Sequence, residues 1–102
     1  MYLILREDLA YKYIQGGHAL LQFALEYPNE VTHHNNQHLI FLSVFNGIAL
    51  RDKMLELESL AMQFSKFVEP DLESELPTAL AIYEDGSGYV SQALQGLSLA
   101  TK

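Results

Sequence analysis

The segment from Ile14 to Glu26 combines the broad apolar surface of a buried helix with a line of polar side chains along one edge. At about 3.6 residues per turn, its apolar and small residues cover a wider arc than a helix packed on a single sheet requires. The polar line follows i, i+4, i+7 and i+11, and it consists of Tyr11, Gln15, His18 and Gln22. Such a helix is typical of the wall of a site, although packing against a sheet explains everything except the polar line.

Two adjacent glycines, Gly16 and Gly17, lie in the middle of this helix. Each costs about 1 kcal/mol there relative to alanine, so the pair indicates that another backbone, or a ligand, comes close to the helix. A small molecule bound at this glycine pair, in a pocket formed with Tyr11, Gln15 and His18, is therefore one function to consider.

Two apolar segments flank the helix and predict strands. Met1–Arg6 is short, and Leu39–Phe45 is a continuous apolar run, as in strands that are covered on both faces. Asp8 is the expected N-cap of the helix, and Pro28-Asn29 ends it after Tyr27. Strand, helix and strand in succession predict a crossover unit with two parallel strands and a right-handed connection.

The second half of the chain predicts two more helices and two more strands. After a turn at Asn46-Gly47, a helix runs from about Leu50 to Phe64 and carries an apolar stripe of Leu50, Met54, Leu57, Ala61 and Phe64. The remaining elements are strands at Ser65–Val68 and Thr78–Tyr83, a helix at Tyr89–Gln95 with Gly96 as its C-cap, and an extended segment at Leu97–Ala100. We expect one α/β domain over residues 1–102, with a small four-stranded mixed sheet, helices on both faces and the order βαβαββα.

Two polar connections carry residues with chemical potential. Glu30–Gln37, followed by His38, places three histidines close together, but their spacing is not that of a helical metal-binding pair. We expect a solvated loop there, with no metal and no cofactor. The loop Glu69–Pro77 carries a row of four acids, Glu69, Asp71, Glu73 and Glu75. This row is either a solvated edge that prevents strand pairing or a source of a catalytic carboxylate.

Thirteen acidic residues against six basic ones give the chain a formal net charge of −7. This excess opposes non-specific binding to nucleic acids, whose phosphates are neutralised by Lys and Arg, so such a substrate requires a local basic patch or recognition of an end. No apolar run approaches the ~20 residues that span a bilayer. Tyr2-Leu-Ile-Leu5 has no basic region before it and no small-residue cleavage site, so we expect a strand there and not a signal peptide. The absence of cysteine fits a reducing compartment. We expect a cytoplasmic protein that does not bind membranes.

Three motifs at the amino terminus give the chain a resemblance to type-2 peptidyl-tRNA hydrolases. In order, they are Leu3-Ile-Leu-Arg6, Asp8-Leu9 and Gln15-Gly-Gly-His18-Ala19. A bacterial and phage branch of that family is similar also in a later phrase, which stands here as Phe67-Val-Glu-Pro-Asp-Leu72 and leads into Thr78-Ala-Leu-Ala81. The order of elements resembles the family along nearly the whole chain.

The resemblance implies cleavage of the ester between peptide and tRNA without a metal. The family's helix Gln falls on Gln15 and its catalytic Lys on Tyr11, with Lys12 as neighbour. Its loop Asp falls on Glu69, and Asp71 follows two residues later; the Arg and Thr of that loop have no matching residues.

Ester hydrolysis requires a base that activates water and donors for the developing oxyanion. The candidate catalytic residues are Gln15, His18, Glu69 and Asp71, and the candidate substrate-binding residues are Arg6, Tyr11, Lys12, Gly16 and Gly17. Basic surface for the tRNA is expected at Arg6, Lys12 and Lys66. His18, on an otherwise apolar helix, can instead be a hydrogen-bonded structural residue.

A second hypothesis is a non-catalytic member of the fold that binds a protein or oligomerises. The acidic charge and the replaced lysine favour it. We expect a homodimer.

Overall fold

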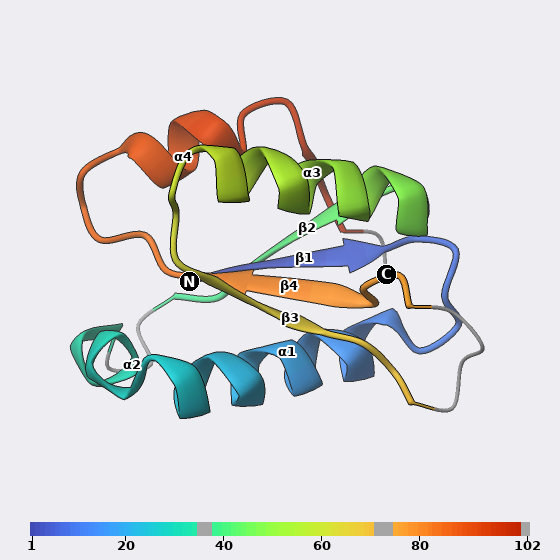
Figure 1. Cartoon of the computed structure of the whole chain (residues 1–102), viewed down its shortest axis with the longest axis horizontal. Helices are drawn as coiled ribbons and strands as arrows, with labels where there is room; N and C mark the ends of the chain where they lie inside the picture. Colours follow the sequence, from blue (N-terminus) through green and yellow to red (C-terminus); the bar gives the residue numbers. More distant parts are fainter. Residues whose placement is uncertain (35–37, 71–74, 101–102) are drawn as a thin grey trace.

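A five-stranded mixed sheet with the order β3-β4-β1-β2-β5 forms the centre of the molecule. The computed structural model describes residues 1–34, 38–70 and 75–100. Helices α1 and α2 cover one face of the sheet, and α3 and α4 cover the other (Figure 1). The helices are α1 Lys12–Glu26, α2 Pro28–His34, α3 Gly47–Ser59 and α4 Tyr89–Ala93. The strands are β1 Tyr2–Arg6, β2 Ile40–Val44, β3 Phe64–Phe67, β4 Ala79–Ile82 and β5 Ser98–Leu99.

The predicted crossover unit is present, because β1 and β2 are parallel, with Leu3 opposite Phe41. Strand β4 lies antiparallel between β1 and β3, so β1 and β3 run in the same direction. Alternate residues of β1 enter two separate cores. Ile4 packs with α3 and α4, whereas Leu3 and Leu5 pack with α1. The α/β class and the helices on both faces are therefore confirmed.

The sheet has five strands rather than four, because the segment after Gly96 pairs with β2 through Leu42 and Leu99. The polar connection predicted at Glu30–Gln37 is also partly helical. Pro28 is the first residue of α2, a position where its missing N–H costs nothing, so it begins a helix directly after α1 ends. The observed element order is βααβαββαβ.

Two helix starts differ from those predicted. Asp8 does not cap α1, which begins at Lys12 after Tyr11; its carboxylate binds Arg6 instead. Helix α3 begins at Gly47, because the Asn46 side chain accepts a hydrogen bond of 3.0 Å from the Ala49 amide. In the described part of the chain, no helix has the length and apolar character needed to cross a membrane.

The close approach predicted at the glycine pair occurs at only one of its members. A Cβ added to Gly16 would lie 2.7 Å from Cδ2 of Leu5, so this glycine lets α1 pack against β1. A Cβ on Gly17 would meet nothing within 4 Å. The group that comes close to Gly16 is therefore the Leu5 side chain, in the core of the protein.

Helix α3 ends earlier than its apolar stripe predicts, with Ala61 in the left-handed region at φ 57°. The Met62 amide donates to the Leu57 carbonyl at 3.1 Å, and the Ala61 amide donates to Glu58 at 3.0 Å. These two bonds form a Schellman motif, in which glycine usually occupies the position of Ala61 because a Cβ is strained there.

Replacing Ala61 by glycine should therefore raise the free energy of unfolding by about 0.5–1 kcal/mol, since relief of the left-handed strain outweighs the added chain entropy. Urea denaturation measures the change. The matched control is Ala24→Gly inside α1, which should lower the free energy of unfolding by about 1 kcal/mol. Destabilisation by Ala61→Gly would show that the position is not strained.

Candidate functional site

Strands β1 and β3 end at the same edge of the sheet, where α1 begins and β4 starts. Side chains that follow these two strands, or that lie on the first turn of α1, therefore gather at one place although they are distant in sequence. Residues Arg6, Gln15, Glu69 and Thr78 all lie there. Figure 1 shows this edge at the arrowhead of β1.

Gln15 is the centre of a hydrogen-bonded cluster at this edge. Its Nε2 donates to Oε2 of Glu69 at 3.2 Å, across 54 residues of sequence. Its Oε1 accepts from the Thr78 hydroxyl at 2.8 Å. Because the amide oxygen and the amide nitrogen each have a partner, the orientation of the Gln15 side chain is fixed.

Thr78 is the member of the cluster that the sequence prediction missed, having placed it only at the start of a strand. It is fully buried, and its hydroxyl lies 2.8 Å from Gln15 and 3.0 Å from the Phe67 carbonyl, so its single hydrogen is shared between two acceptors. A threonine at the start of an apolar strand was the available signal, since a buried hydroxyl requires partners.

Arg6 supports the same segment from the other side. Its guanidinium donates two bonds to the Asp8 carboxylate, at 3.0 and 2.9 Å, and a third to the Pro77 carbonyl at 3.2 Å. Arg6 is only 9% exposed. Hydrogen bonding from Arg6 lowers the pKa of Asp8 below its ordinary value, against the opposing effect of burial. The role of Arg6 as a substrate-binding residue stays a prediction. The contacts that the structure shows for Arg6 are structural, because they join the end of β1 to Asp8 and Pro77.

The Lys12 amine, the cationic group expected next to the ester, is bound to an acidic residue of the chain. The Lys12 amine forms an ion pair with Glu7 at 2.8 Å and lies 5.6 Å from the centre of the Tyr13 ring. Tyr11, which stands at the family's lysine position, is 71% exposed. The basic residue that the resemblance requires is therefore replaced by an exposed phenol, with Lys12 bound to the connection between β1 and α1.

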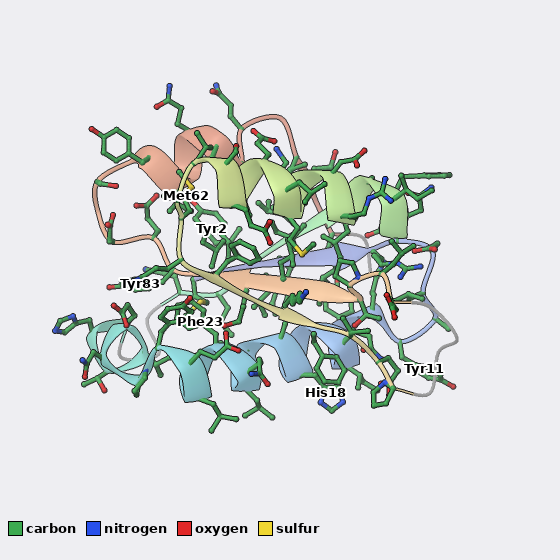
Figure 2. All side chains as sticks on the ribbon, in the orientation of Figure 1. Tyr2, Tyr11, His18, Phe23, Met62 and Tyr83 are labelled. Carbon is green, nitrogen blue, oxygen red and sulfur yellow. The ribbon has the colours of Figure 1, made fainter. Side chains whose placement is uncertain are left out.

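His18 lies one turn after Gln15 and contacts the site by stacking. Its ring lies 4.6 Å from that of Phe67, at an interplanar angle of 21°. Figure 2 shows His18 on α1 and Tyr11 at the end of the molecule where this helix begins. The stacking brings His18 close to β3, the strand that Glu69 follows.

Two of the remaining predicted residues do not join the cluster, and a third, Asp71, lies outside the described residues. Gly16 is packed against Leu5, and Gly17 faces open space. Within residues 1–34, 38–70 and 75–100, no group of three or more histidine or acidic side chains is placed to hold a metal.

The cluster has the groups that ester hydrolysis by water requires. The half-buried Glu69 carboxylate can accept a proton from water, and the Gln15 amide is a donor held in a fixed direction.

No protein-family model matches the chain, and no match is found among curated proteins.

Proposed function

We propose that this protein hydrolyses an ester of the peptidyl-tRNA type, with Glu69 as the general base and Gln15 as a positioning and oxyanion-stabilising donor. The observation that carries the proposal is the hydrogen bond between Gln15 and Glu69, which come from different elements and meet at the edge where β1 and β3 end. Both residues also lie within the motifs that carry the resemblance to type-2 peptidyl-tRNA hydrolases.

In this reaction, Glu69 takes a proton from a water molecule that attacks the ester carbonyl and returns it to the ribose oxygen as the acyl C–O bond breaks. The products are tRNA with a free terminal hydroxyl and the peptide acid, which ionises to a carboxylate. Thr78 fixes the amide of Gln15, so that its N–H groups face the carboxylate and the substrate. The acid-rich chain requires the tRNA to approach by its 3′ end, because non-specific phosphate contacts are unfavourable at a net charge of −7. The activity would belong to the cytoplasm, where such esters arise.

The test is release of N-acetylated amino acid from N-acetyl-aminoacyl-tRNA by the purified full chain. We expect turnover in the presence of a metal chelator. The absence of turnover at an enzyme concentration above that of the substrate would refute the proposal.

A second candidate function is self-association through the outer face of α1. Five residues there follow the 3-4-3-4 spacing of a coiled-coil seam, and we call them the α1 seam: Tyr11, Ile14, His18, Leu21 and Leu25. Ile14 is 57%, Leu21 65% and Leu25 79% exposed. The inner stripe of α1, which contains Phe23, packs on the sheet, whereas Ile14, Leu21 and Leu25 of the seam are exposed and its His18 stacks on Phe67.

Charge favours a second copy of the chain as the partner of the seam. A two-fold interface places like residues near like residues, so in an acidic protein it requires a face without free charge. The charged residues of α1 are Lys12 and Glu26, at its two ends and outside the seam. Lys12 is neutralised by Glu7, and the Glu26 carboxylate accepts hydrogen bonds from Gln22 and Ser65.

The double substitution Leu21→Lys with Leu25→Lys should therefore convert a dimer into a monomer of 11.5 kDa, because each copy places two charges in the seam. Sedimentation velocity at increasing protein concentration measures the change. The control is Ile48→Lys with Leu55→Lys, two residues with similar exposure on α3, which should leave the dimer intact. A wild-type protein that stays monomeric would exclude this function.

A further inference from the structure

A cavity of about 750 Å³ lies at the end of the sheet opposite Gln15. It is bounded by the connection from α3 to β3 and by the segment that follows β4, and residues of α2 and α4 contribute to it. Figure 2 shows Phe23, Met62 and Tyr83 at this end of the molecule and Tyr11 at the other. The cavity is therefore separate from the proposed hydrolase site.

The cavity has the size and the apolar floor of a small-molecule site, which typically encloses ~300–1,000 Å³. Met62 and Ala93 supply partly exposed apolar surface, while Phe23 and Val90, which also line the cavity, are buried in the two cores of the protein. The strained Ala61 also lines it.

The charged groups that line the cavity are all acidic. Glu30 comes from α2 and Asp85 from the loop after β4, and no Lys, Arg or His is among the described lining residues. Tyr83 and Tyr89 also line the cavity, and aromatic rings attract cations. Hydrogen bonds from Ser87 lower the pKa of Asp85, so this carboxylate is ionised at neutral pH.

The loop that carries Asp85 is held in place by its neighbour Glu84. The Glu84 carboxylate accepts from the amides of Gly86 at 3.1 Å, Gly88 at 3.4 Å and Ser91 at 2.9 Å, and from the Ser91 hydroxyl at 2.7 Å. Because one carboxylate ties the loop to the first turn of α4, this wall of the cavity is formed before any ligand binds. Preformed walls reduce the entropy cost of binding.

We propose that this cavity binds an organic cation with an aromatic or aliphatic body, the body against Met62 and Ala93 and the cationic group between Glu30 and Asp85. Anionic ligands of the same shape are disfavoured, since both carboxylates repel them and the described lining residues include no basic side chain. The Lys53 amine, which donates to the Ala93 carbonyl, is ion-paired with Glu56.

A matched pair of probes tests the proposal. Phenethylammonium and 3-phenylpropionate have the same ring and linker and opposite charge. In ¹H–¹⁵N spectra of the full chain, phenethylammonium should shift the amides of Ala61, Val90 and Ala93 saturably, with a Kd near or below about 1 mM, as expected for a ligand of this size. 3-Phenylpropionate should leave these amides unchanged.

The variant Glu30→Gln with Asp85→Asn should weaken binding of phenethylammonium by about tenfold or more, while Glu58→Gln with Asp52→Asn on α3 should not change it. The spectra of all variants also report whether the fold is retained. Equal shifts with both probes, shifts confined to other regions, or no saturation would each overturn the proposal. These outcomes are independent of ester cleavage, because the cavity and Gln15 lie at opposite ends of the sheet.

Discussion

Replacing Glu69 by glutamine should lower kcat/KM for cleavage of N-acetyl-aminoacyl-tRNA by a factor of about 100 or more, the usual contribution of a positioned general base. The substitution keeps the shape of the side chain and removes its ability to take a proton. Glu69 is half-buried at the edge of the sheet and receives its bond from Gln15 at 3.2 Å. An amide oxygen at position 69 can still accept that bond, so the free energy of unfolding should change little.

Glu75→Gln is the matched control, because Glu75 lies in the same acidic loop and is exposed. It should retain full activity. Gln15→Ala should also lower the rate, by removing the donor and leaving the Thr78 hydroxyl without that acceptor. Full activity in Glu69→Gln, together with loss of activity in Gln15→Ala, would show that a residue other than Glu69 is the general base. Activity retained in both would refute this site.

The parts of the fold that the sequence predicted best are those that depend on local pattern. The apolar runs around β1 and β2 and the periodicity of α1 led to a parallel crossover unit, which the register of Leu3 and Phe41 confirms. Strand β5 has only two residues and forms by pairing with β2. Because this pairing depends on tertiary structure, the composition of the segment could not identify it as a strand. Helix α2 was missed because its residues are polar and Pro28 was interpreted only as the end of α1.

The site was predictable in part. The meeting of Gln15 with Glu69 was expected from the resemblance, and the structure places the two side chains within hydrogen-bond distance. The parts that only tertiary structure determines are the buried hydroxyl of Thr78 and the stacking of His18 on Phe67. A histidine on an otherwise apolar helix gives no indication of which neighbour its ring will contact.

Arg6→Met should lower the free energy of unfolding by about 2–4 kcal/mol, because it leaves the buried Pro77 carbonyl without its donor and removes both bonds to Asp8. The methionine keeps the apolar part of the side chain, so the loss reports on the guanidinium. Urea denaturation measures it. The control is Arg51→Met, in which an exposed arginine is lost together with an exposed 3.4 Å ion pair to Asp52; its effect should be within about 0.5 kcal/mol.

The pH dependence distinguishes the ion pair from the bond to Pro77. The pKa of Asp8 is lowered in the folded protein, so the stability that this carboxylate contributes is complete above its ordinary pKa of 3.8 and is lost as the pH falls through the lowered value. The difference between wild type and Arg6→Met should therefore shrink at acidic pH, without vanishing, since the Pro77 carbonyl does not titrate. A difference that is the same at pH 7 and below the lowered pKa would show that Asp8 contributes nothing. Because Pro77 precedes Thr78, the variant should also release the hydroxyl that orients Gln15, and ester cleavage should fall even where the protein remains folded.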